Sequence, residues 1–165
     1  MKPIRLFLTD VDGCLTDGGM YYGASGEEMK RFCVYDGMGM VLLRKAGIKC
    51  GILTSETTEI VARRAQKLQL DYLYQGVGAH NIKTKLDTAK DICAELNISL
   101  DEVCYVGDDI NDIDLLREVG LAPWPPGVFS MRMFGKARTS GRAFGGHVAK
   151  PTSRNKSISL MSSPT

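Results

Sequence analysis

Short apolar runs alternate with segments of helical periodicity over the first 120 residues, and this alternation limits the possible folds. Apolar runs typical of buried strands occur at residues 4–9, 48–55, 71–76 and 101–109. Segments with apolar residues at helical spacing follow at residues 37–47, 56–70, 84–97 and 111–120. Strands that alternate with helices predict a parallel sheet covered by helices on both faces. We therefore expect a Rossmann-like α/β fold, with a small β-hairpin flap over residues 19–34.

The composition predicts one domain followed by a tail of different character. The chain has 165 residues, of which 44% are hydrophobic, enough for a single compact core over residues 1–122. Residues 119–165 contain seven Lys or Arg and no Asp or Glu. The segment 123–165 is rich in Gly, Pro and Ser, so we expect an atypical basic extension without regular structure. The loss of all acids also suggests an altered reading of the end of the chain.

The charge distribution and the cysteines indicate which cellular compartment and which partners to expect. The body is acidic and no nucleic-acid-binding motif occurs in the sequence, so no nucleic-acid partner is expected. No apolar stretch approaches the roughly 20 residues of a membrane span, and the N-terminus does not resemble a secretory signal. The five cysteines form no CxxC pair and are expected to be reduced. We expect a cytoplasmic protein with no membrane partner.

Polar residues stand at the predicted carboxyl ends of several strands. Asp10 and Asp12 follow the first strand, Thr54 follows the second and Asp108 follows the fourth. Lys85 opens the helix after the third strand. Ligands of open α/β sheets bind at the carboxyl ends of the strands. We therefore expect these five side chains to converge on one rim.

This set of residues suits phosphoryl transfer through a covalent aspartyl-phosphate. Asp10 is the candidate nucleophile, and Asp12 is the candidate general acid and then base. Asp10, Asp12 (through its backbone carbonyl) and Asp108 would hold Mg²⁺, which prefers oxygen ligands. Thr54 and Lys85 would bind the phosphate oxygens. The set predicts a magnesium-dependent phosphatase.

Each residue also has a purely structural interpretation. Asp108 and Asp109 would cap the helix that starts near Asn111, and Thr54 would cap another helix. Lys85 would be a solvated helix residue. Their occurrence together, each at a predicted strand end, favours the functional interpretation.

The motifs resemble those of a known superfamily. The stretches DVDGCLTDG, ILTSE, TKL and VGDDINDIDLL are similar to the four motifs of the haloacid dehalogenase superfamily. More narrowly, FLTDVDGCLTDGGMYY and YVGDDIND resemble the small cap-less sugar-acid phosphatases, and the resemblance covers about residues 4–122. That group includes phosphatases of 3-deoxy-D-manno-octulosonate 8-phosphate (Kdo-8-phosphate) and of nonulosonate 9-phosphates. The resemblance implies Mg²⁺, the site roles given above, and a homotetramer whose hairpins meet near the centre.

Two residues bear on the choice of substrate. Glu56 stands where Kdo-8-phosphate phosphatases typically have arginine, and Lys67 follows eleven residues later. This pair resembles the branch that acts on 2-keto-3-deoxynononate 9-phosphate and related sialic-acid precursors, which is therefore the favoured substrate class. Kdo-8-phosphate is the alternative, and Glu56 and Lys67 would then be ordinary surface charges. Lys83 rivals Lys85 as the phosphate-binding lysine, but Lys85 precedes Leu86 as in the family's KL pair.

A non-catalytic oligomerisation module is the competing interpretation from another class. Related folds fused to vertebrate sugar-nucleotide synthetases have lost their catalytic acids. This chain keeps all of the candidate catalytic groups, namely Asp10, Asp12, Lys85 and Asp108. The sequence therefore favours the enzyme.

Overall fold

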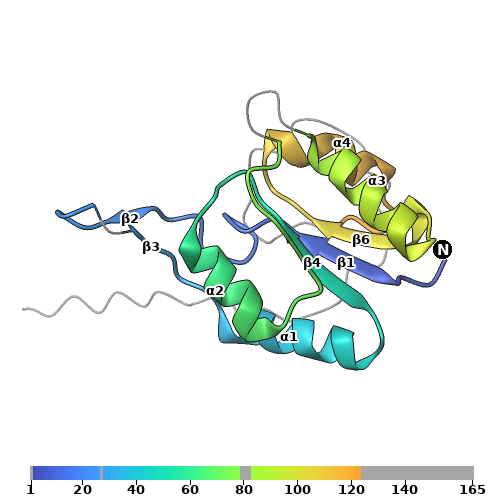
Figure 1. Cartoon of the computed structure of the whole chain (residues 1–165), viewed down its shortest axis with the longest axis horizontal. Helices are drawn as coiled ribbons and strands as arrows, with labels where there is room; N and C mark the ends of the chain where they lie inside the picture. The colour runs from blue at the N-terminus through green and yellow to red at the C-terminus, as the bar shows by residue number, and fades with distance from the viewer. Residues whose placement is uncertain (1, 27, 79–82, 124–165) are drawn as a thin grey trace, which may run out of the picture.

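Four parallel strands form the centre of the molecule. A computed structural model describes residues 2–26, 28–78 and 83–123. The strands are β1 (Leu6–Thr9), β4 (Lys49–Leu53), β5 (Tyr72–Tyr74) and β6 (Val103–Val106), in the spatial order β5-β4-β1-β6. β1 pairs in parallel with β4 on one side and with β6 on the other (Figure 1). The predicted parallel sheet is confirmed.

Two pairs of helices cover the two faces of this sheet. Figure 1 shows α1 (Val34–Lys45) and α2 (Glu59–Leu68) on one face, and α3 (Lys85–Leu96) and α4 (Ile113–Glu118) on the other. Each face has its own buried cluster. Met40, Val61 and Ala65 belong to the cluster under α1 and α2, and Ile92 and Leu115 belong to the cluster under α3 and α4. The expected α/β architecture is therefore correct.

Capping residues explain where several predicted helix bounds were wrong. α2 begins at Glu59 rather than at Glu56, because the hydroxyl of Thr58 accepts a hydrogen bond from the N–H of Val61 and caps the helix there. Thr84 caps α3 in the same way through the N–H of Asp87. The last predicted helix begins with a 3₁₀ turn (Ile110–Asp112) before α4.

The hairpin is shorter than predicted. Its strands are β2 (Tyr21–Tyr22) and β3 (Glu28–Met29), and it projects beyond the body of the molecule (Figure 1). The flap was predicted over about residues 19–34, and α1 begins at Val34. An isolated bridge between Thr16 and Phe32 joins the base of the hairpin to the loop after β1. The hairpin is thus anchored at its base and solvated at its tip.

The last described residues add one more contact to the sheet edge. Leu121 forms an isolated parallel bridge with Cys104, and the N–H of Tyr105 donates to the carbonyl of Leu121 at 3.0 Å. The predictions for residues 123–165 concern a segment that, apart from Pro123, lies outside the described residues. Over the ranges that the structure describes, no helix has the length and apolar character needed to cross a membrane.

Candidate active site

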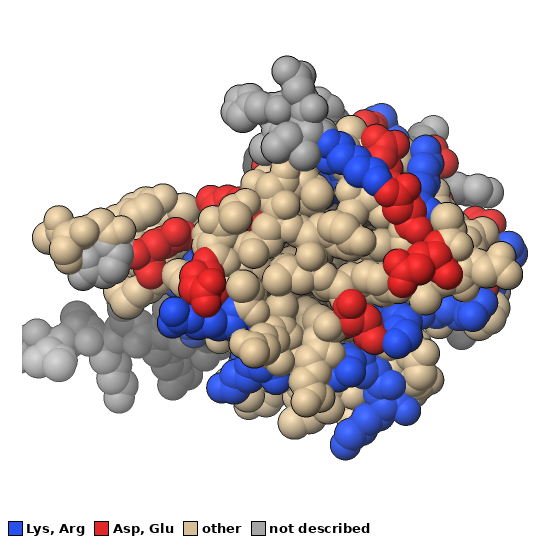
Figure 2. All heavy atoms as spheres, in the orientation of Figure 1, with Lys and Arg blue, Asp and Glu red and all other residues tan. Residues whose placement is uncertain are grey.

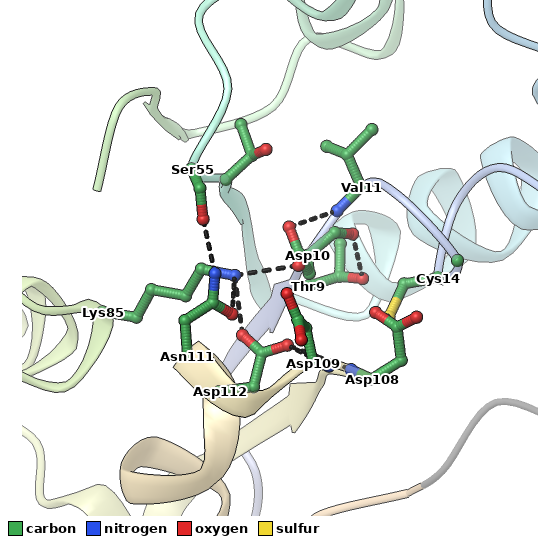
Figure 3. Close-up of polar contacts among 12 residues, drawn as sticks. Thr9, Asp10, Val11, Cys14, Ser55, Lys85, Asp108, Asp109, Asn111 and Asp112 are labelled. Carbon is green, nitrogen blue, oxygen red and sulfur yellow. Dashed lines mark hydrogen bonds and ion pairs between the residues drawn. The ribbon is translucent and has the colours of Figure 1, made fainter. Parts of the chain in front are cut away.

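The loops that follow β1, β4 and β6 enclose a polar cleft. Its volume is about 370 Å³. The cleft is lined by Asp10, Asp12, Gly13, Gly18, Thr54, Ser55, Glu56, Asp108, Asp109 and Asn111. Figure 3 shows Asp10 near the centre of the polar cluster, with Lys85 on one side and Asp108 on the other. The predicted convergence at the carboxyl end of the sheet is therefore seen.

Asp10 is buried directly after β1 and held by two donors. Its Oδ1 accepts from the N–H of Val11 at 2.7 Å, and its Oδ2 pairs with Nζ of Lys85 at 2.8 Å. The residue is 6% exposed. Burial raises the pKa of Asp10 to about 6, although the ammonium of Lys85 opposes this shift. The result is a carboxylate of fixed orientation that is poorly solvated, which suits a nucleophile.

Lys85 joins Asp10 to a second buried carboxylate, that of Asp112. Nζ of Lys85 lies 2.7 Å from Oδ1 of Asp112 and 3.2 Å from Oδ1 of Asn111, and the lysine side chain is fully buried. Burial acts to lower the pKa of Lys85, but the two carboxylates outweigh it and raise the pKa. Lys85 is therefore a structural cation at the site and not the solvated helix residue of the alternative interpretation.

Asp112 has every side-chain oxygen engaged. Its Oδ1 also accepts from the hydroxyl of Tyr105 at 2.5 Å. Its Oδ2 accepts from the N–H groups of Asp108 and Asp109, each at 3.0 Å. Asp112 thereby fixes the loop after β6 onto Lys85.

Asp108 comes close to the loop that carries Asp10 and Asp12. Carboxylate oxygens of Asp10, Asp108 and Asp112 lie within 4.8 Å of one another, a grouping that could hold a metal ion. A Cβ at Gly13 would meet the carboxylate of Asp108, and Gly13 has a φ of +80°. Glycine suits position 13 because residues with a side chain are strained in this backbone conformation.

Asp12 is linked to the hairpin by a lysine. Nζ of Lys30, which directly follows β3, lies 2.7 Å from Oδ1 of Asp12 and 2.6 Å from Oε2 of Glu56. A third carboxylate, that of Glu28, lies 3.4 Å away. The side chain of Lys30 is only 1% exposed. Burial acts to lower the pKa of Lys30, but its bonds to Asp12 and Glu56 outweigh burial and raise the pKa.

Thr54 and Ser55 form the wall of the cleft that follows β4. Thr54 is 2% exposed, and its hydroxyl accepts from the N–H of Glu56 at 3.4 Å. The hydroxyl of Ser55 accepts from the amide of Asn111 at 2.5 Å, which ties this loop to the loop after β6. The helix cap is Thr58 and not Thr54, so the structural interpretation of Thr54 was wrong.

Three other residues that the sequence analysis considered have roles or positions apart from the Asp10–Lys85 cluster. Lys67 is exposed in the last turn of α2 and does not line the cleft, so its role in specificity stays a prediction. Lys83 is half exposed and pairs with Asp91. Asp109 caps the 3₁₀ turn by accepting from the N–H of Ile110 at 2.6 Å, as the capping interpretation held.

Sequence reasoning missed Asp112 and Lys30. Asp112 stands four residues after Asp108 in a 3₁₀ turn, and this spacing returns its side chain to the N–H groups of the same loop. The acid-rich stretch GDDIND contains that signal. Lys30 has no comparable signal, because its partners lie 18 and 26 residues away along the chain.

Comparison with known proteins gives consistent matches. Residues 29–120 match the haloacid dehalogenase-like hydrolase family. The 3-deoxy-D-manno-octulosonate 8-phosphate phosphatase KdsC of Escherichia coli K12 is 39% identical over 121 residues, covering 73% of this chain and 62% of that protein. The chain thus spans less than two thirds of the length of this curated relative.

Solved structures agree in fold. A hypothetical protein from Xanthomonas campestris superposes with a TM-score of 0.73 at 37% identity, covering 79% of this chain and 69% of that one. The 3-deoxy-D-manno-octulosonate 8-phosphate phosphatase of Moraxella catarrhalis, solved with magnesium, phosphate and KDO, gives 0.66 at 38% identity, covering 71% and 64%. The fold, the buried aspartate–lysine pair and the sequence match point to one conclusion: this chain belongs to the haloacid dehalogenase-like hydrolase family.

Proposed function

We propose that this chain is a magnesium-dependent phosphatase of 2-keto-3-deoxy sugar-acid phosphates, with Kdo-8-phosphate as its substrate. The observation that carries the proposal is the setting of Asp10. Its carboxylate is fixed between Lys85 and the N–H of Val11, and it lines the same cleft as Asp12 and Asp108. That arrangement supplies a nucleophile, an acid/base and metal ligands within one small volume.

The carboxylates fit a magnesium ion. Asp10, Asp108 and the backbone carbonyl of Asp12 would hold it, since Mg²⁺ prefers oxygen ligands and takes few from the protein. Asp112 belongs to the same cluster, but its oxygens already accept from Lys85, Tyr105 and two N–H groups, so it would position the ligands. When bound, the ion offsets the charge of the phosphoryl oxygens.

The first half of the reaction makes the aspartyl-phosphate. A carboxylate oxygen of Asp10 attacks phosphorus, forming an O–P bond while the bond from phosphorus to the sugar oxygen breaks. The sugar oxygen keeps that electron pair and takes a proton from the carboxyl group of Asp12. Thr54 and Lys85 would bind the phosphoryl oxygens, with a phosphate oxygen replacing Asn111, the longest of the Lys85 contacts at 3.2 Å.

The second half returns the enzyme to its starting state. Water attacks phosphorus and gives its proton to the carboxylate of Asp12. The bond from phosphorus to Asp10 breaks, inorganic phosphate leaves, and Asp10 regains its carboxylate. Asp12 therefore acts once as acid and once as base.

The eight-carbon substrate is proposed in place of the nine-carbon substrate that the sequence favoured. The named relatives are Kdo-8-phosphate phosphatases. The nine-carbon preference rested on the resemblance of Glu56 and Lys67 to one branch of the family, and the carboxylate of Glu56 pairs with Lys30 at 2.6 Å. Glu56 still lines the cleft, so 2-keto-3-deoxynononate 9-phosphate remains the second candidate.

The decisive experiment measures phosphate release from both sugar-acid phosphates by the full chain. We expect Mg²⁺-dependent release with kcat/KM at least about 10-fold higher for Kdo-8-phosphate, the ratio that a difference of about 1.4 kcal/mol in transition-state binding gives. Removal of the metal by chelation should return the rate to background, and added Mg²⁺ should restore it.

Three outcomes separate the candidates. A preference for the nine-carbon substrate would keep the chemistry and replace the proposed substrate. Release that chelation does not change would contradict the metal assignment. A folded protein that releases phosphate from neither compound would favour the oligomerisation module.

We also propose that the chain assembles as a homotetramer through its hairpin. Large apolar side chains are exposed on the hairpin and the start of α1: Tyr22 is 67% exposed, Met29 61%, Val34 77% and Tyr35 86%. Such a patch is typical of a subunit interface. Light scattering should give four times the chain mass of 18.1 kDa, and Tyr22→Ser with Met29→Ser should give smaller species. A wild-type protein that stays monomeric would contradict this assembly.

We place this function in the cytoplasm. All five cysteines are free thiols, and three of them, Cys50, Cys93 and Cys104, are buried. Unpaired thiols are typical of proteins from reducing compartments, which supports this location.

A further inference from the structure

The side chain of Lys30 is buried where the hairpin meets the cleft. Burial of a charged ammonium group costs free energy. The side chain is 1% exposed, and a buried ammonium needs anionic partners. Its partners come from three separate segments: Asp12 after β1, Glu56 after β4 and Glu28 in β3. One cation therefore joins the hairpin to the two loops that form the mouth of the cleft.

The backbone around Lys30 is fixed on both sides. Before it, β3 pairs with β2 through Met29 and Glu28. After it, Phe32 bridges to Thr16 in the loop that follows β1. Lys30 thus reaches Asp12 from a restrained position, unlike a surface lysine with many rotamers.

The contact with Lys30 gives the two carboxylate oxygens of Asp12 different environments. Lys30 donates to Oδ1 at 2.7 Å. Within the described ranges 2–26, 28–78 and 83–123, no hydrogen bond or ion pair involves Oδ2 of Asp12. Oδ1 is therefore held, and Oδ2 is left for the proton that passes to and from the leaving oxygen.

We propose that Lys30 is a positioning residue that holds the Asp12 carboxyl group in the orientation from which it protonates the leaving oxygen. This inference rests on the proposed phosphatase function and adds the hairpin to its machinery. Lys30 acts through Asp12: as phosphorus bonds to Asp10 and its bond to the leaving oxygen breaks, the proton moves from Oδ2 of Asp12 to that oxygen. Loss of Lys30 should therefore lower the rate most for substrates whose leaving oxygen must be protonated.

Two esters of similar shape separate positioning from general damage. Phenyl phosphate releases a basic phenolate that depends on protonation, whereas p-nitrophenyl phosphate releases a stable anion. The first chemical step is reported by kcat/KM, measured on the full chain with Mg²⁺. For Lys30→Met we expect kcat/KM to fall by about 10- to 100-fold with phenyl phosphate, part of the about 10²–10⁴-fold that a general acid contributes. With p-nitrophenyl phosphate we expect a fall of less than about threefold, because that step needs little proton transfer.

Control variants exclude other causes. Arg31→Met removes the next cation of the same segment, whose side chain is 80% exposed and pairs with Asp17, and it should leave both rates unchanged. Lys30→Arg keeps a charged donor and should restore the ratio of the two esters toward wild type. If Lys30→Met does not fold, Lys30→Gln, which keeps a shorter donor, replaces it in the same comparison.

The outcomes distinguish this proposal from the function on which it rests. Equal losses on both esters, or no loss on either, would overturn the positioning role while the phosphatase stands. A folded wild-type chain that hydrolyses neither the esters nor the sugar-acid phosphates would overturn both. A selective loss with phenyl phosphate that Lys30→Arg relieves would support the proposal.

Discussion

Asp10→Asn is expected to lower phosphate release from Kdo-8-phosphate by about 10⁴-fold or more, the scale seen when a covalent nucleophile is removed. The amide has nearly the same shape as the carboxyl group, but its oxygen cannot form the aspartyl-phosphate. The substitution also removes a carboxylate whose pKa burial raises to about 6, so folding at neutral pH should not suffer. The loss should therefore arise at the active site and not from unfolding.

The measurement pairs a phosphate-release assay with thermal unfolding of the same samples. Asp114→Asn is the matched control, because Asp114 lies on α4 with a side chain that is 76% exposed. It should keep wild-type activity. An Asp10→Asn variant that is folded and retains more than about 1% of the wild-type rate, against the loss expected for a nucleophile, would remove Asp10 from that role.

Lys85→Met is expected to destabilise the fold by about 3–5 kcal/mol near pH 7.5, the cost of leaving buried carboxylates without their partner. Lys85 is fully buried and pairs with Asp10 at 2.8 Å and with Asp112 at 2.7 Å. Methionine fills similar volume but offers no charge. Since whole domains are stable by only about 5–15 kcal/mol, urea denaturation without added metal should show the change clearly.

The pH dependence of this loss identifies its cause. Lys85 opposes the upward shift of the Asp10 pKa, so in its absence that pKa should rise further above the usual value of 3.8. The folded variant then binds a proton that the unfolded chain does not, and its stability falls as the pH rises through that window. The difference from wild type should therefore shrink toward pH 5. Lys90→Met, an exposed change on α3, is the control, and an equal loss at both pH values would contradict this explanation.

Strand periodicity was enough to place the reacting groups. Asp10, Asp12, Thr54 and Asp108 stand at the ends of apolar runs, and parallel strands bring such ends to one edge by geometry alone. The superfamily motifs cover the same positions, so both routes gave one site. The predicted bounds of the hairpin and the helices were less accurate. The start of α2 depends on capping by Thr58, and α1 begins at Val34 without a side-chain capping hydrogen bond.

The surroundings of Glu56, Lys67 and Lys30 could not be predicted from the sequence, because they depend on contacts between distant segments. Glu56 and Lys67 were treated as one helical pair, but Glu56 precedes the capped start of α2 while Lys67 lies in its last turn. Lys30 meets Asp12 and Glu56 only because the base of the hairpin lies beside the cleft in the folded protein, a contact that no sequence period predicts. Long-range ion pairs of this kind require the tertiary fold.

The connectivity of β1 has a consequence for what else such a chain could do. Its two neighbours in the sheet, β4 and β6, are reached in opposite directions, so the loops that follow the three strands diverge and leave a crevice above β1. The crevice belongs to the backbone path and not to the aspartates that now line it. Exchange of the loops at these strand ends would therefore give a site of different chemistry on the same sheet, because the order of the strands sets where a ligand binds.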